Sequence, residues 1–230
     1  MDSRWRCPRC GPVAGWHVSR RVDAEIMAGV AARARTSGGA GQELPAEFVD
    51  LVAPEEHVPL WCPWPLPVGW TVTGVGWAGD DRTGVRATAV ALSGPAPLQS
   101  GPADIVFVAE QPGVGLGAGL AGLGGIDPGP GLRDAVVTTA PHAKIRADGH
   151  PTPLWAVPAG PGRSLYVGEA RAIWLYVVAW PPAAGYLLAD GIILHDCVDS
   201  LPGELVYGAP TARLKPGRSI NTPDEFGRTD

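Results

Sequence analysis

The sequence predicts a β-rich α+β protein, with a mostly antiparallel sheet and a short helical, zinc-knuckle-like N-terminal extension. Three observations support this class. Glycine (32) and proline (25) make up about a quarter of the 230 residues, which disfavours long helices. Short apolar stretches recur between turn-forming residues, as they do in antiparallel sheets. A Cys-Pro-Arg-Cys-Gly motif lies near the N-terminus.

The chain divides into four stretches. Residues 1–36 form a basic head with the cysteine motif and a helix over 21–35, where apolar residues recur at helical spacing. Residues 37–58 are predicted to be a linker with a short helix. Residues 59–208 form the β-rich core domain. The polar stretch 209–230 is interrupted by proline and glycine and is expected to be a disordered tail.

Within the core domain we expect a series of strands. Trp70–Ala78 and Val85–Leu92 flank the turn sequence GDDRTG and should form a hairpin. Asp104–Ala109 is almost continuously apolar, as expected of a strand covered on both faces. Five more strands are expected, at His142–Ala147, Pro153–Val157, Leu165–Val167, Ala172–Trp180 and Tyr186–Leu194. Periodicity alone leaves open whether residues 183–194 are partly helical.

Composition excludes a helical membrane protein. The longest apolar run, Ile173–Trp180, has eight residues, whereas a spanning helix needs about 20. The charged N-terminus contains no apolar segment of the kind found in signal peptides. Four cysteines are too few for a disulfide scaffold in a chain of this length. We therefore expect a cytoplasmic protein without a membrane partner.

Charge is distributed unevenly around the net value of −5. Residues 1–36 contain seven arginines and three acidic residues, so the head is positive and the rest of the chain is negative. A basic head can contact nucleic acid or an acidic protein. It can equally dock on the acidic body of its own chain.

The cysteine motif suggests zinc. Cys7 and Cys10 have the spacing at which two thiolates bind one Zn²⁺, and a glycine follows for the tight turn. His17 is the candidate third ligand, and a fourth would come from Cys62, His57, an acidic residue or a partner chain. A degenerate knuckle without metal and a redox cysteine pair are the alternatives.

A glycine-rich loop, Gly113–Gly125, follows the Asp104–Ala109 strand. Gly117, Gly119 and Gly122 have the G-x-G-x-x-G spacing of phosphate-binding loops. That chemistry requires a helix to begin at the loop, and the glycine and proline that follow disfavour one. We therefore expect a mobile surface loop, with phosphate binding as the alternative.

Candidate catalytic residues are few. Glu110 ends the strand before the loop, where it can point into a cleft. Asp80 and Arg82 lie in a predicted turn. Glu169 and Arg171 have the spacing to pair with each other along an extended stretch.

Four tryptophans cluster between residues 61 and 77, with prolines among them. Aromatic rings on such a segment can stack on a base, a sugar or a proline-rich peptide. They can also simply pack the core, which is the interpretation we favour.

Several unusual motifs occur in order: PWPLPVGW, AGDDRTGVRAT and GVGLGA, followed by DPGPG and HAKIRADGHPTPLWAV. Over residues 58–197 the chain resembles an uncharacterised family of actinobacterial proteins, defined only as a domain of unknown function. The resemblance implies an N-terminal C-P-x-C-G knuckle and a second pair resembling C-x-x-H-G, together forming a small zinc ribbon. Cys7 and Cys10 match the first half, whereas the second half is absent here.

These observations favour a non-catalytic cytoplasmic binding or regulatory module, whose degenerate zinc knuckle contacts protein or nucleic acid. The alternative is a small transferase-like enzyme that holds a phosphate or acyl-phosphate group in the Gly113–Gly125 loop. An enzyme should bring together loop N–H groups, an acid and an arginine, either Arg82 or Arg171.

Overall fold

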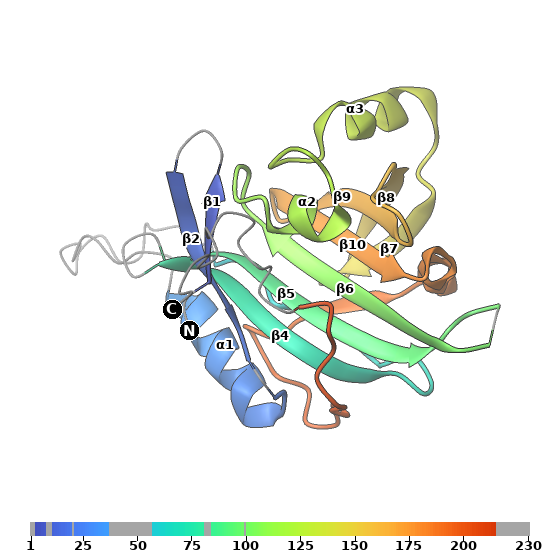
Figure 1. The fold of residues 1–230 in the computed structure, drawn as a ribbon. Coiled ribbons are helices and arrows are strands. Elements are labelled where there is room, and N and C mark those ends of the chain that lie inside the picture. Colours follow the sequence, from blue (N-terminus) through green and yellow to red (C-terminus); the bar gives the residue numbers. More distant parts are fainter. Residues whose placement is uncertain are drawn as a thin grey trace, which may run out of the picture.

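An eleven-stranded sheet dominates the computed structural model, which describes residues 3–7, 11–19, 21–36, 57–80, 84–98 and 100–214 (Figure 1). Strands succeed one another across it in the order β1-β2-β4-β5-β6-β10-β9-β8-β7-β11-β3. The strands are β1 (Ser3–Cys7), β2 (Gly11–Val18), β3 (Trp61–Pro63), β4 (Thr71–Asp80), β5 (Gly84–Pro95), β6 (Pro102–Glu110), β7 (Ala143–Ala147), β8 (His150–Val157), β9 (Ser164–Ala170), β10 (Ile173–Trp180) and β11 (Ile193–Asp196). The helices are α1 (Ala24–Thr36), α2 (Leu116–Ala121), α3 (Gly129–Thr138) and the 3₁₀ helix η2 (Pro182–Asp190).

The sheet curls over itself. All strand pairs are antiparallel except β7 with β11. Strand β8 joins two parts of the sheet, because its residues 155–157 pair with β9 and residues 150–154 pair with β7. As a result β3, at the end of the strand order, packs against β5 and β6. The predicted β-rich, mostly antiparallel class is confirmed.

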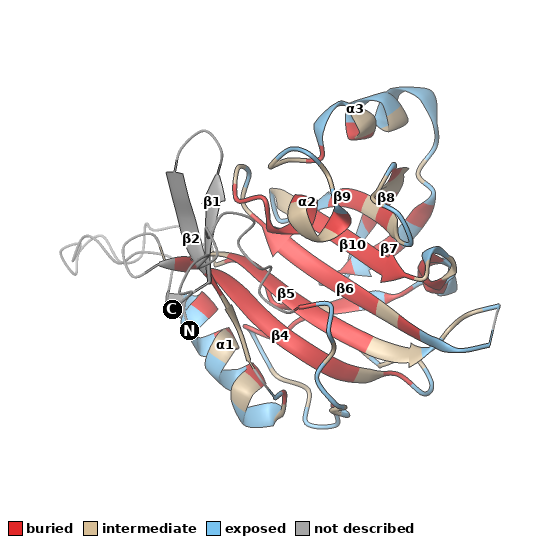
Figure 2. Ribbon diagram, viewed as in Figure 1, coloured by how far each residue is buried: buried red, intermediate tan, exposed pale blue. Residues whose placement is uncertain are grey.

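Both faces of the central strands are buried (Figure 2). One set of alternate side chains, including Ile105 and Phe107, forms what we call the α1-side core with Met27 of α1. The other set, including Val106 and Val108, forms the α2-side core, which α2 covers. Continuous apolar sequence is therefore expected in β6, and the strand predicted there is confirmed.

The predicted hairpin is found, and the structure adds a second one. Asp80 pairs with Gly84 across the β4–β5 connection. Ala147 pairs with His150 across a two-residue turn, in which the Asp-Gly dipeptide supplies the positive φ angles that such a turn requires.

The tryptophans pack the core, as the favoured interpretation predicts. Trp61, Trp70 and Trp77 are buried in the α1-side core, and Trp64 is half-buried against it. None of these three buried rings offers a free stacking surface.

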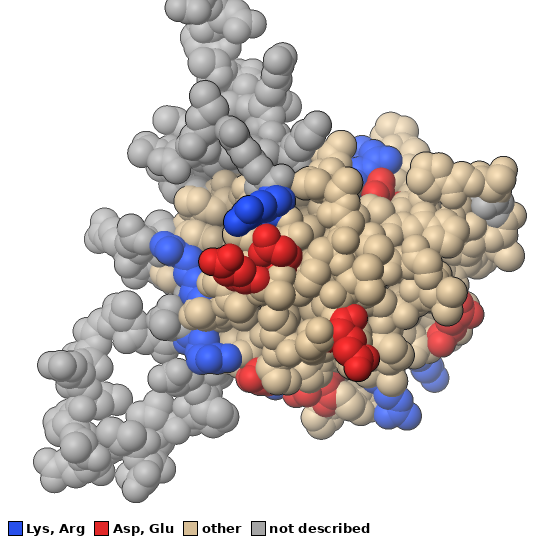
Figure 3. Space-filling view, turned by 90° about the horizontal axis from the view of Figure 1, so that it is seen from below, with Lys and Arg blue, Asp and Glu red and all other residues tan. Residues whose placement is uncertain are grey.

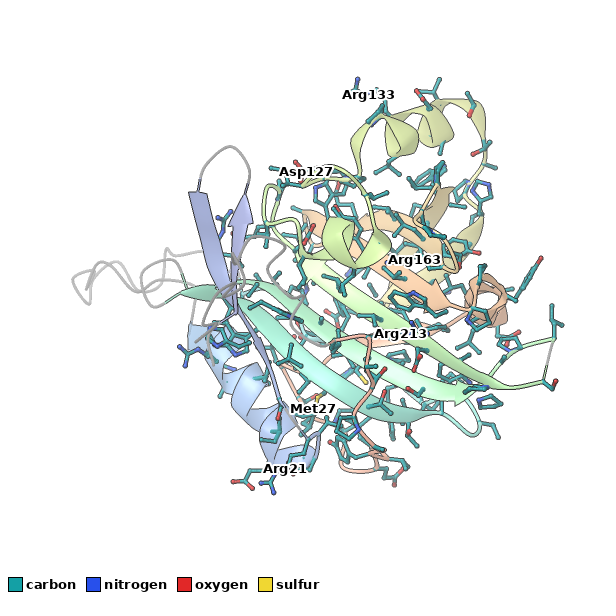
Figure 4. The ribbon with its side chains drawn as sticks, in the orientation of Figure 1. Arg21, Met27, Asp127, Arg133, Arg163 and Arg213 are labelled. Carbon is teal, nitrogen blue, oxygen red and sulfur yellow. The ribbon has the colours of Figure 1, made fainter. Side chains whose placement is uncertain are left out.

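The N-terminal region contains two strands that the sequence analysis did not predict. β1 and β2 form a hairpin, and β2 pairs with β4, so this region extends the central sheet. The predicted helix is confirmed as α1, and its Met27 lies against the sheet (Figure 4). Arg33 stacks on Trp77, and Arg35 donates a hydrogen bond to the Val198 carbonyl. Two arginines of the head therefore dock on the protein's own body. The predicted linker, from residue 37 to 56, lies outside the described residues.

Two sequence predictions were wrong. Residues 182–190 form the 3₁₀ helix η2, and only Ile193–Asp196 of the next stretch is a strand. The supposed mobile loop contains α2, whose residues Leu116, Gly117 and Ala118 are buried. Local glycine content disfavours helix, but burial of this apolar turn against β6 and β10 outweighs that preference.

The chain stays ordered beyond residue 208, where the predicted tail begins. The Thr211 N–H donates to the Thr73 carbonyl at 2.8 Å, and Leu214 is buried in the α2-side core. The Leu214 side chain packs against Gly74 of β4, where no side chain stands between them. Residues 209–214 therefore belong to the fold, and residues 215–230 lie outside the described part of the chain.

We expect Leu214→Ala to lower the free energy of unfolding by about 2–4 kcal/mol, because it removes buried methyl groups and leaves a cavity. Chemical denaturation measures this. Leu98→Ala is the matched control, since the Leu98 side chain is 83% exposed and should change stability by less than about 0.5 kcal/mol. Equal effects of the two variants would contradict the packing of Leu214.

Candidate functional site

A group of polar side chains is buried on the α2-side of the sheet. Glu110, the last residue of β6, lies directly opposite Trp174 of β10. Tyr176 lies two residues further along β10, so its side chain is on the same face. Asp127 approaches from the connection between α2 and α3 (Figure 4). We call Glu110, Asp127, Trp174 and Tyr176 the Glu110 centre.

The glycine-rich segment closes over this centre. The Gly117 N–H donates to Glu110 Oε2 at 2.9 Å, and the Gly113 N–H donates to Asp127 Oδ1 at 2.9 Å. A Cβ atom at position 117 would lie 2.4 Å from the Tyr176 ring, so only glycine allows α2 to approach this closely. The glycines therefore serve close packing over an acidic residue.

Polar atoms in the centre are left without partners. Glu110 Oε1, the Tyr176 hydroxyl and Trp174 Nε1 are buried and have no hydrogen-bond partner of ordinary geometry in the described part of the chain. Buried polar groups of native proteins are nearly always bonded, so three together require an explanation.

Burial controls the protonation of Glu110. Desolvation raises its pKa to about 7, and the negative charge of Asp127 acts in the same direction. The Gly117 N–H and the neighbouring Tyr176 hydroxyl oppose this rise by stabilising the carboxylate. Burial and the adjacent carboxylate also raise the pKa of Tyr176, so its hydroxyl keeps its proton. Glu110 therefore changes charge near neutral pH.

The predicted phosphate loop uses its N–H groups internally. Gly119 donates to the Gly115 carbonyl and Gly122 to the Gly119 carbonyl, whereas Gly113 and Gly117 donate to the side chains of Asp127 and Glu110. Of the other predicted site residues, Asp80 ends β4 and only its backbone is described. Arg82 lies outside the described residues.

A second polar cluster surrounds Asp196, whose side chain is 1% exposed. Its Oδ1 accepts the N–H groups of Leu60 and Val198, each at 3.0 Å. Its Oδ2 lies 2.8 Å from His57 Nε2 and accepts a 2.8 Å hydrogen bond from Arg171 Nη1. We call this cluster the Asp196 hub.

Arg171 extends the hub to two more acidic residues. Its Nη2 donates to Asp148 at 2.7 Å and lies 3.3 Å from Asp199. The expected pairing with Glu169 is absent from the ion pairs of the described residues. The three aspartates thus neutralise one guanidinium, which leaves the hub with excess negative charge.

The turn that carries Arg171 is strained. Arg171 and Ala172 connect β9 to β10 and have φ angles of 55° and 59°. Left-handed conformations cost a residue with a side chain about 1–2 kcal/mol each, and glycine or asparagine usually fills such turns. The ion pairs of Arg171 with Asp148, Asp196 and Asp199 offset this cost.

The two clusters lie on opposite faces of the sheet. Arg171 packs 5.8 Å from the Trp61 ring, which belongs to the α1-side core, whereas Glu110 faces the α2-side core. The described residues therefore do not bring loop N–H groups, Glu110 and Arg171 together, as the enzyme interpretation required.

Sequence reasoning identified only some of these residues. Glu110, Gly117 and Arg171 were candidates because of their positions at strand ends and in the glycine-rich run. Tyr176 and Trp174 were hidden in an apolar strand. Asp148, Asp196 and His57 are far apart in sequence, so no local signal could have joined them.

The predicted zinc ligands lie partly outside the described residues. Only the backbone of Cys7 is described, and it pairs with Gly11 in the β1–β2 hairpin. His17 lies in β2 and stacks on Trp77, with the ring centroids 4.0 Å apart. Cys10 lies outside the described residues, so zinc binding by the cysteine motif stays a prediction.

Other candidate ligands are located elsewhere. Cys62 and Cys197 are buried free thiols, and contact with Cys197 and burial raise the pKa of Cys62, which disfavours thiolate formation. His57, Asp196 and Asp199 place one ligand atom each within 4.8 Å of one another. The Arg171 guanidinium already lies among these atoms and supplies one positive charge there.

Comparison with known proteins gives one match. A model of the family of unknown function DUF6758 matches residues 1–214, a range that includes both the cysteine motif and the buried Leu214. Neither the curated proteins nor the solved structures contain a match. In the described part of the chain, every helix is too short or too polar to cross a membrane.

Asp196→Asn should lower the free energy of unfolding by about 3–5 kcal/mol, because it leaves His57 and Arg171 without their buried anion. Denaturant titration measures this loss. Asp199→Asn is the control: the Asp199 side chain is 51% exposed, so its removal should cost less than about 1 kcal/mol. A small effect at Asp196 would show that the hub is not structural.

Glu110→Gln should remove a pH dependence of stability. The pKa of Glu110 rises from 4.5 to about 7 on folding, so the folded state binds the proton more tightly. Its contribution is complete below pH 4.5 and is lost as the pH rises through 7. Between about pH 5 and pH 8 the stability difference should shift by about 2–3 kcal/mol in favour of the variant. Parallel pH profiles for the two proteins would contradict the assignment.

Proposed function

We propose, for a chain that belongs to the family of unknown function DUF6758, a role as a non-catalytic binding module whose ligand is a small protonated amine held at the Glu110 centre. The observation that carries this proposal is that the buried Glu110 Oε1 and the neighbouring Tyr176 hydroxyl make no hydrogen bond of ordinary geometry, to each other or to the other described residues. A buried acceptor of this kind is costly unless a donor reaches it.

The charge of the centre favours a cation. Glu110 and Asp127 are both acidic, and neither makes an ion pair with a described lysine, arginine or histidine. A buried carboxylate is stabilised most strongly by an opposite charge that also donates hydrogen bonds. An ammonium group meets both conditions.

The neighbouring aromatic residues suit the same ligand. The faces of Trp and Tyr rings attract cations, and Trp174 and Tyr176 lie on the same face of β10 as Glu110. The Tyr176 oxygen can accept a second ammonium N–H. Trp174 Nε1 is a donor only, so it calls for an oxygen on the ligand. These requirements together describe a small amino alcohol such as ethanolamine.

Access requires movement of α2, since Glu110 is fully buried. This helix has six residues and is bounded by Gly115 and Gly122, whose φ angles are 85° and 73°. Glycine tolerates the backbone rotations that a hinge requires. The Gly117–Glu110 hydrogen bond is the polar contact that joins α2 to the centre and that an incoming ligand would rearrange.

Acid–base catalysis is the competing function, because a carboxyl with a pKa near 7 is suited to proton transfer. Binding is favoured here because Arg171 faces the opposite side of the sheet. The hydrogen bonds of the described residues also place no serine, cysteine or histidine against Glu110.

Ethanolammonium chloride should raise the melting temperature of the wild-type protein by roughly 2–5 °C at about pH 8, at concentrations well above its Kd. Differential scanning fluorimetry at constant ionic strength measures this shift. Tetramethylammonium chloride should give no rise, because it has the charge but no N–H groups. The rise should shrink below the pKa of Glu110, where the neutral acid no longer attracts a cation.

Two variants provide the controls. Glu110→Gln should lose the shift, and Glu204→Gln, at an exposed glutamate, should keep it. An equal shift in Glu110→Gln, or an equal shift with tetramethylammonium, would refute the amine site. The absence of a shift with any amine would mean that water alone satisfies the centre.

A further inference from the structure

A groove lies away from both polar clusters, between the segment 65–70 and the end of η2. Its volume is about 530 Å³. One wall contains the prolines, Leu66, Val68 and Trp70, and the other contains the residues around the start of β11. The lining residues are Pro65, Leu66, Pro67, Val68, Trp70, Leu187, Asp190, Gly191, Ile192 and Ile193.

Apolar side chains at the groove are open to solvent. The Val68 residue is 95% exposed and Ile193 is 46% exposed, although both are large and hydrophobic. Exposed apolar residues at a concave site offer a surface that a partner can cover. Figure 3 shows the molecule from below, where charged side chains form separate small groups with uncharged surface between them.

The walls are held in place before any partner binds. The Trp64 N–H donates to the Ile193 carbonyl at 2.9 Å, which ties the two walls together at one end. Pro65 and Pro67 have fixed φ angles, so this wall loses little conformational freedom on binding. The groove is therefore suited to an extended chain that inserts apolar side chains.

Charge indicates which kind of chain fits. Asp190 is the only charged residue among those that line the groove, and it is exposed. A lysine or arginine beside the apolar side chains of the partner would pair with it, and an acidic partner would be repelled. The absence of basic lining residues also removes the usual means of holding phosphate, which disfavours nucleic acid.

We propose that this groove docks an extended apolar segment of a partner protein, with a basic residue of that segment facing Asp190. This inference rests on the groove alone and is independent of the amine site. It concerns a different part of the molecule, so either proposal can fail while the other stands.

The experiment uses a random peptide library displayed on phage, selected against the full chain. Selected peptides should contain apolar residues beside a lysine or arginine. Val68→Asp should weaken binding of the selected peptides by about tenfold or more, measured by fluorescence anisotropy. Asp190→Lys should weaken it as well, and a second selection against that variant should yield acidic peptides.

Leu98→Asp is the matched control, because Leu98 is also large, apolar and exposed but does not line the groove. It should bind the peptides as the wild type does. Melting temperatures of all variants should match the wild type, since the substituted side chains are on the surface. Unchanged binding in Val68→Asp, or no enriched peptide, would overturn the proposal. A dimer in solution that Val68→Asp disrupts would also overturn it, since the groove would then hold a second copy of the chain.

Discussion

The buried carboxylate of Asp196 joins segments on which the curl of the sheet depends. It accepts hydrogen bonds from the chain before β3, from the β9–β10 turn and from the residues after β11. A desolvated anion must find donors, and only the folded arrangement of these segments supplies four of them. The same contacts bring the terminal strand β3 over the central sheet and offset the strain at Arg171 and Ala172.

The position of Arg171 also affects the Glu110 centre on the other face of the sheet. The two-residue β9–β10 turn fixes the start of β10, and the register that follows places Trp174 opposite Glu110. The Asp196 hub and the Glu110 centre therefore both lie near the β9–β10 turn, but their hydrogen bonding differs. Both carboxylate oxygens of Asp196 have hydrogen-bond partners within the protein, which supports a structural role for the hub. Glu110 keeps an oxygen without a hydrogen bond of ordinary geometry among the described residues, and this is the observation behind the proposed amine site.

Sequence patterns predicted the strands and the helix whose formation depends on neighbouring residues. Alternation and turn chemistry located most of the strands, and helical spacing located α1. Two failures have one cause, which is that tertiary packing outweighed local preference. The helix at Leu116–Ala121 exists because Gly117 lets it rest on Tyr176, and Pro182–Asp190 turns because it packs on β9 and β10. The members of the Asp196 hub are up to 142 residues apart, from His57 to Asp199, so only the folded chain reveals them.

In the proposed amine site, proton binding and ligand binding at Glu110 are linked, so the pH determines how tightly the amine would bind. The neutral acid is favoured by burial, so an ammonium ligand must displace a proton near neutral pH before the ion pair forms. Apparent affinity for the amine therefore rises with pH until Glu110 is fully ionised, and then levels off. If Asp127 were replaced by a neutral residue, the pKa of Glu110 would fall, because one repulsive charge would be gone. The ligand would then compete with a more weakly held proton but would gain less from the local negative charge. The second carboxylate thus adds to burial, which is the main cause of the raised pKa of Glu110, in determining the pH at which the amine would replace the proton.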